Sequence, residues 1–140
     1  RLILVVNGLL SKKARSTESE RLLEWGFREF NNYALFEKGT EVETANVWLG
    51  KASTVPLIIE QDVKITLARK SREKMKVTVS FKGPIPAPIK KGDKIAVLKI
   101  TAPGRKPMEI LLSAGADVER LGLIGRLGAA LSSILWGHAG

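Results

Sequence analysis

The region from residue 33 to about residue 115 consists of short runs in which apolar and polar side chains alternate. Residues 62–69 and 75–83 show the alternation most clearly, and residues 94–104 and 106–113 form another such pair. Each run is typical of a strand with one face buried and the other in water. Six or so strands at this spacing predict a mainly β fold, a small antiparallel sandwich or barrel.

Turn residues separate these runs. The tripeptide Lys-Gly-Thr at residues 38–40 lies between two short apolar runs, and it predicts a hairpin there. Residues 91–93 and 103–104 predict further turns, and three prolines interrupt the chain between strand pairs: Pro84, Pro86 and Pro88.

The first 32 residues follow a different pattern. Residues 2–6 are a continuous apolar run with β-branched side chains, which predicts a strand buried on both faces. A helix is predicted to begin at Ser16 or Thr17 and to end at residues 31–32. Its apolar stripe contains Leu22, Leu23, Gly26, Phe27 and Phe30. A strand followed by a helix indicates one unit of an α/β domain.

Residues 119–140 predict an amphipathic helix of about four turns, which is too short to cross a bilayer. Such a helix can lie flat in a membrane interface, with its tryptophan at the level of the head groups. The expected membrane-anchoring side chains are Leu121, Ile124, Leu127, Leu131, Leu135 and Trp136. The predicted organisation is therefore 1–32, 33–118 and 119–140.

The charge and the cysteine content narrow the function classes. The formal net charge is +9, which favours anionic partners such as nucleic acid, acidic lipid head groups or an acidic polymer, and charge alone does not choose among them. The sequence contains no cysteine, which excludes disulfides, thiolate metal sites and cysteine nucleophiles. Three glycines (Gly122, Gly125 and Gly128) lie in an apolar helical run without a preceding strand, so close helix packing explains them better than a phosphate loop.

Ser71 and Lys74 have the S-x-x-K spacing of a serine nucleophile and its lysine. That chemistry requires a helix on which the amine and the hydroxyl stack. Here the two residues fall between two alternating strands, and the sequence predicts that they form the exposed tip of a hairpin. We interpret Ser71 as a surface serine and expect no catalytic residue in this chain.

Five cations surround this serine: Arg69, Lys70, Arg72, Lys74 and Lys76. They predict either a solvated hairpin end or an anion-binding patch for head groups or a cell-wall polymer. Nucleic acid is not expected, because no aromatic residue for base stacking is close in the sequence.

The acidic residues have no spacing that favours acid–base catalysis or metal binding, so no cofactor or metal is expected. They are interpreted as surface charges: Glu41, Glu43, Glu60, Asp62 and Asp93. Trp25 and Trp48 are predicted to be core residues, whereas Trp136 fits either a membrane interface or packing on another chain.

The order of these segments resembles the low-molecular-mass penicillin-binding proteins, the serine D-alanyl-D-alanine carboxypeptidases. Residues 1–8 and the helix around residues 25–27 (Trp-Gly-Phe) resemble the end of their catalytic domain. Residues 47–50 (VWLG) and 87–100 (APIKKGDKIAVLKI) resemble their C-terminal β-domain, and the last helix resembles their membrane anchor. The resemblance covers nearly the whole chain.

This resemblance implies a bacterial periplasmic enzyme, attached peripherally to the cytoplasmic membrane, that removes the terminal D-alanine from peptidoglycan peptides. In that family the catalytic motifs precede the segment that begins at Arg1. The chain is therefore expected to be an inactive C-terminal fragment that serves as a stalk and membrane attachment. Its expected partners are the membrane surface, peptidoglycan through the catalytic domain, and further copies of itself through residues 1–30. The alternative is a basic β-domain that binds an anionic polymer or a cell-wall protein.

Overall fold

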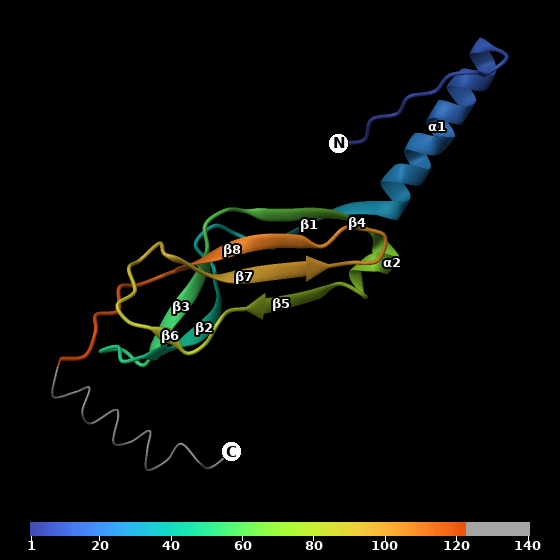
Figure 1. Cartoon of the computed structure of the whole chain (residues 1–140). Coiled ribbons are helices and arrows are strands. Elements are labelled where there is room, and N and C mark those ends of the chain that lie inside the picture. Colours follow the sequence, from blue (N-terminus) through green and yellow to red (C-terminus); the bar gives the residue numbers. More distant parts are fainter. Residues whose placement is uncertain (123–140) are drawn as a thin grey trace.

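The computed structural model describes residues 1–122 of the 140-residue chain. One long helix is followed by short strands, so the predicted mainly β fold is confirmed (Figure 1). In chain order the elements are α1 (Lys12–Glu29), β1 (Phe30–Phe36), β2 (Glu41–Trp48), β3 (Thr54–Ile59), β4 (Val63–Ala68), α2 (Arg69–Arg72), β5 (Lys76–Ser80), β6 (Ile85–Pro86), β7 (Lys94–Thr101) and β8 (Met108–Ala114).

The strands form a two-stranded sheet, β1-β4, and a six-stranded sheet in the order β5-β7-β8-β3-β2-β6. Every pairing between these strands is antiparallel except that of β2 with the short β6, which is parallel. The larger sheet is therefore mixed, and the prediction of a purely antiparallel fold is wrong at this edge. The predicted strand pair around residues 103–104 is confirmed, because β7 pairs with β8.

The hairpin predicted at residues 38–40 is wrong. A turn is present, with Gly39 at φ 88°, but it carries the chain from one sheet to the other. β1 pairs with β4, so that Phe30 lies opposite Ala68, and β2 pairs with β3. The turn therefore reverses the chain direction between β1 and β2, but it does not determine which strand pairs with β1.

One apolar core lies between the two sheets. The alternation predicted for β4 is confirmed, because Val63, Ile65 and Leu67 are all buried. They join side chains from the larger sheet in a single cluster that includes Val55, Leu57, Ile59, Ala96, Leu98, Ile100 and Leu112. Burying such side chains stabilises the fold by about 1.5–3 kcal/mol each relative to leaving them in water.

The helix α1 begins earlier and ends earlier than the sequence predicts. Ser11, not Ser16 or Thr17, is the N-cap, and its hydroxyl accepts a hydrogen bond of 3.1 Å from the N–H of Ala14. This bond satisfies one of the first-turn donors that a helix leaves unpaired. At the other end Phe30 is already extended and starts β1.

The strand predicted at residues 2–6 is absent. Ile3 and Val5 are 77% and 83% exposed, and no strand in the described residues pairs with this segment. Leu2 instead lies against Gly26 of α1, where an added Cβ would come within 2.9 Å of the leucine side chain. Because an isolated strand leaves its backbone groups without a ladder, the apolar run alone does not form one here. The predicted strand–helix unit of an α/β domain is thus reduced to its helix.

Trp25 and Trp48 are both about half exposed, so their prediction as core residues is wrong. Trp25 packs edge-to-face on Phe30, with ring centroids 5.6 Å apart. Trp48 ends β2 and has its backbone, rather than its ring, in the structure's hydrogen-bond network: its carbonyl oxygen accepts from the N–H of Ala87 over 2.9 Å.

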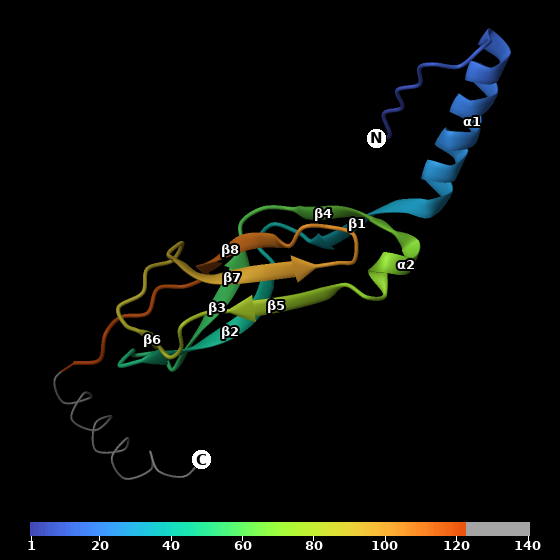
Figure 2. The same ribbon diagram turned by 45° about the vertical axis from the view of Figure 1, so that its right-hand side comes forward.

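The two ends of the described chain lie at opposite ends of the β-domain. In both views the chain enters the β-domain from α1 at the end that carries α2, residue 1 itself lying beside α1, whereas residues 115–122 leave from the end where β2 and β6 lie (Figures 1 and 2). Among the described residues, no helix has the length and apolar character needed to cross a membrane. Of the predicted C-terminal helix, everything after residue 122 lies outside the described residues.

Candidate functional surfaces

Ser71 lies in α2, a single helical turn that connects β4 of the small sheet to β5 of the large one. The predicted hairpin tip is wrong, since β4 and β5 do not pair. Within the part of the chain that the structure describes, the Ser71 hydroxyl forms no hydrogen bond with Lys74 or with any other group. Ser71 therefore lacks the lysine contact and the orienting partner that nucleophilic catalysis requires.

The five cations predicted as an anion-binding patch lie together, on α2 and on the segment that leads into β5. All five are exposed, and none forms an ion pair with a described residue. Arg72 stacks over the ring of Tyr33 on β1, with its guanidinium carbon 4.5 Å from the ring centroid. The sequence does not predict this contact, because Arg72 and Tyr33 are far apart in the chain and meet only when β1 pairs with β4.

Two further cations lie beside this patch. Arg105 and Lys106 are exposed in the turn between β7 and β8, and Arg105 lines the same hollow as Ser71. The hollow has a volume of about 490 Å³ and an apolar floor that includes Phe30 and Leu67. The sequence does not place these two cations with the patch, because they lie some thirty residues from α2 along the chain. They join the patch through the pairing of β5 with β7, since Lys76 faces Thr101, the residue that ends β7.

Residues 115–122 are hydrogen-bonded to the end of the domain that lies opposite α2. Val118 and Ile89 exchange two backbone hydrogen bonds of 2.8 and 2.9 Å. The N–H of Lys51 donates to the carbonyl oxygen of Glu119, and the N–H of Leu121 donates to that of Leu49, each over 2.8 Å. The chain therefore leaves the domain at a defined place.

An ion pair strengthens the same attachment. The ammonium of Lys51 contacts the carboxylate of Glu119, and this hydrogen bond and charge hold the pKa of Glu119 below its ordinary value. Leu121 is the only predicted anchor residue in the described part of the chain. The other predicted anchor residues (Ile124, Leu127, Leu131, Leu135 and Trp136) lie outside the described residues, as does the remainder of the predicted helix.

The acidic residues remain dispersed. Glu60 contacts Lys94, whose ammonium also donates to the hydroxyl of the buried Ser113 over 2.8 Å. The hydrogen bonds from Lys94 and Ser113 lower the pKa of Glu60. Asp93 accepts a hydrogen bond from the N–H of Lys90 within one turn, whereas Asp62 accepts one from the N–H of Lys38, which follows β1. In residues 1–122 no three acidic, histidine or cysteine side chains come together in an arrangement that could hold a metal ion.

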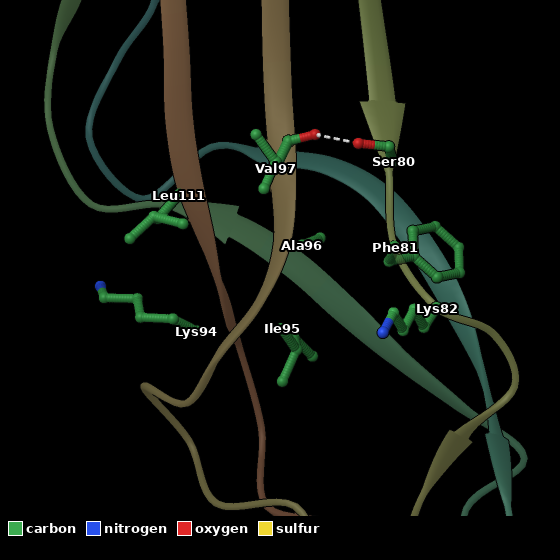
Figure 3. Close-up of a pocket in the computed structure, with 8 residues that line it drawn as sticks. All are labelled: Ser80, Phe81, Lys82, Lys94, Ile95, Ala96, Val97 and Leu111. Carbon is green, nitrogen blue, oxygen red and sulfur yellow. Dashed lines mark hydrogen bonds between the residues drawn. The ribbon is translucent and has the colours of Figure 1, made fainter.

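An open groove of about 450 Å³ crosses the outer face of the large sheet (Figure 3). Ser80, Val97 and Leu111 lie across β5, β7 and β8, with Lys82 and Lys94 at the margins. The hydroxyl of Ser80 donates to the carbonyl oxygen of Val97 over 3.5 Å, and Lys94 is held by Glu60. The groove thus has an apolar floor and no pairing of a nucleophile with a base.

The chain was compared with known protein families and with curated proteins, and both comparisons found similar sequences. Residues 30–120 match the family described as "Penicillin-binding protein 5, C-terminal domain". The chain is 30% identical over 129 residues to the D-alanyl-D-alanine carboxypeptidase DacA of Haemophilus influenzae, covering 91% of this chain and 33% of that protein. It is 31% identical over 128 residues to DacC of Escherichia coli, covering 91% of this chain and 32% of that protein.

Solved structures agree. The crystal structure of penicillin binding protein 5 from Haemophilus influenzae superposes with a TM-score of 0.63 at 27% identity, over 79% of this chain and 32% of that one. The carboxypeptidase DacD from Francisella tularensis superposes with a TM-score of 0.60 at 25% identity, over 81% and 29%. The chain thus spans about a third of the length of the curated relatives that it matches.

Proposed function

Because this chain belongs to the penicillin-binding protein 5 C-terminal domain family, we propose that it is the non-catalytic spacer and membrane attachment of a D-alanyl-D-alanine carboxypeptidase. In this proposal the enzyme acts on peptidoglycan in the bacterial periplasm, from the surface of the cytoplasmic membrane. The chain divides into the end of the catalytic domain (1–32), the β-domain (33–118) and the membrane-attached segment (119–140).

This proposal rests on the separation between α1 and residue 122, which lie at opposite ends of the β-domain. α1 leaves the β-domain at one end and residue 122 leaves at the other (Figures 1 and 2). In this proposal the arrangement holds the catalytic domain, which precedes α1, away from the membrane surface to which residues 123–140 attach. The hydrogen bonds of residues 118–121 support the same role, because they join the segment before residue 123 directly to the β-domain.

Membrane attachment is proposed to come from apolar side chains after residue 120. Burying leucine side chains contributes about 0.8 kcal/mol for each CH₂ group removed from water, so one helical face supplies several kcal/mol. Arg126 is the only charged residue in 121–137, and electrostatic attraction to acidic lipid is therefore secondary.

The test is sedimentation of the full chain with phosphatidylethanolamine–phosphatidylglycerol vesicles. We expect binding that persists at high salt and that is abolished by Leu127→Asp combined with Leu131→Asp. The matched control is Ile3→Asp combined with Leu111→Asp, which places the same two charges on exposed apolar positions of the described domain. Binding that disappears at high salt, or that the control also abolishes, would contradict the proposal.

A further inference from the structure

The end of the domain that carries α2 concentrates positive charge from two separate stretches of the chain. We call it the basic end, and define it as the patch on residues 69–76 together with Arg105 and Lys106. It holds seven exposed cations and one carboxylate, Glu73. No ion pair neutralises any of the seven among residues 1–122. Ser71 and Arg105 line one hollow, which shows that the two stretches adjoin.

The position of the basic end relative to the membrane follows from the strands. Lys76 faces Thr101 at the end of β7, whereas Lys94, seven residues earlier on that strand, faces Ser113 next to the segment that leads to residue 122. At 3.3 Å per residue, β7 separates the two ends of the domain by roughly 25 Å. The Debye length at physiological salt is about 8 Å. If residues beyond 122 lie on the membrane, as proposed above, the head-group charge is strongly screened at the basic end.

The chemistry of the basic end selects the kind of ligand. An exposed cation contributes little by itself, so appreciable affinity requires several anionic groups that bind at once. A linear polymer can supply them across both stretches, whereas a single small anion cannot. Base stacking is not provided, because the ring of Tyr33 is already covered by Arg72.

We propose that the basic end binds a linear polyanion, a polymer with closely spaced carboxylate or phosphate groups, on the side of the domain turned away from the membrane. This goes beyond the spacer function, and its orientation rests on that function. The patch and the turn act together, so that the bound polymer spans from α2 to the β7–β8 turn.

The test measures binding of fluorescently labelled poly-L-glutamate and of polyphosphate to the full chain by anisotropy. The triple variant R69Q/K70Q/K74Q is expected to weaken binding by about tenfold, and R105Q/K106Q by several fold. Arg72 is left intact, because it packs on Tyr33. The matched control K82Q/K90Q/K91Q removes three exposed cations from the opposite end and should leave affinity nearly unchanged.

The outcomes separate this proposal from the membrane proposal. Equal losses in the patch variant and in the control would show attraction by net charge alone and would overturn the proposal, as would an absence of polymer binding. The patch variants are expected to bind vesicles as the unmodified chain does; a loss of vesicle binding in R69Q/K70Q/K74Q would make lipid head groups the ligand instead. The variant L127D/L131D should bind polymer normally, so failure of membrane attachment shows only in the vesicle assay.

Discussion

The N–H of Leu121 donates a hydrogen bond of 2.8 Å to the carbonyl oxygen of Leu49, and this contact fixes the end of the described chain to the turn that follows β2. Leu49 has a φ of 57°, a left-handed conformation that costs a residue with a side chain about 1–3 kcal/mol. The neighbouring Gly50 forms a bridge with Arg120. The turn therefore accepts local strain while it holds the segment on which the proposed spacer role depends.

Replacing Gly50 with alanine should destabilise the protein by about 1–3 kcal/mol, because the new methyl group has no space. A Cβ at this position would lie 2.7 Å from side-chain atoms of Val47 and Val118 and 2.8 Å from the carbonyl oxygen of Ala52. Urea denaturation of the full chain measures the loss. Gly122→Ala is the control, since apart from its chain neighbours no heavy atom of residues 1–122 lies within 4 Å of a Cβ there. Equal stability of the two variants would show that residues 118–121 do not pack on the turn.

The Lys51–Glu119 pair makes the attachment of residues 115–122 sensitive to acid. Its hydrogen bond lowers the pKa of Glu119, so the stabilisation is present above the ordinary carboxyl pKa and is lost as the pH falls through the lowered value. Lys51→Met should raise the pKa of Glu119, measured by NMR titration of the side-chain carbonyl carbon. The pKa of Glu60, which Lys94 and Ser113 lower, should stay unchanged and serves as the internal control. An unaltered Glu119 titration in Lys51→Met would exclude the pair in solution.

Alternation in the sequence predicted strands better than it predicted their partners. In β4 each second residue is apolar, and these side chains face the core because a strand directs successive side chains to opposite faces. Pairing depends on surfaces that lie far apart in the sequence. A glycine turn at residues 38–40 therefore suggested a local hairpin, although β1 buries its Tyr33 and Leu35 only when it joins β4.

The candidate surfaces were predictable to a similar extent. A dense run of cations at residues 69–76 was visible in the sequence, and the structure leaves that run exposed and without ion pairs among the described residues. Arg105 and Lys106 were not, because their turn comes beside α2 only through the pairing of β5 with β7, in which Lys76 lies opposite Thr101. The apolar run at residues 2–6 was misleading, because its composition favours a strand although no described strand pairs with it.

Adjacent leucines on β8 should differ sharply in their contribution to stability. Leu112 is fully buried, whereas Leu111 is 57% exposed on the outer face of the sheet. Leu112→Ala should cost about 2–5 kcal/mol, because it removes buried apolar surface and leaves a cavity, and Leu111→Ala should cost less than about 1 kcal/mol. Chemical denaturation compares the two variants directly. Similar losses would mean that the two faces of the sheet are equally covered in solution.

Residues 1–30 should make the chain self-associate. Ile3, Val5 and Phe27 are largely exposed, and apolar side chains left in water favour contact between copies. Light scattering should show a mass that rises with concentration. Ile3→Lys combined with Val5→Lys should lower it to that of the monomer, whereas Leu111→Lys, on the exposed outer face of the sheet, should not. A monomeric mass over the whole concentration range would contradict the expectation.

Ser71 should not react with β-lactams, despite its S-x-x-K spacing. In the described part of the chain its hydroxyl has no hydrogen-bond partner, and Lys74 lies in the turn after α2 with its ammonium exposed. No base therefore contacts the hydroxyl, and an unactivated serine hydroxyl is a weak nucleophile.

A fluorescent penicillin provides the measurement, with gel detection of covalent adducts. The full chain and its Ser71→Ala variant should both remain unlabelled, while the intact carboxypeptidase DacA of Haemophilus influenzae serves as the positive control. Labelling of the chain that disappears in Ser71→Ala would make α2 an active site and would refute the non-catalytic role. Labelling that survives in the variant would direct the search to another nucleophile, and it would contradict that role equally.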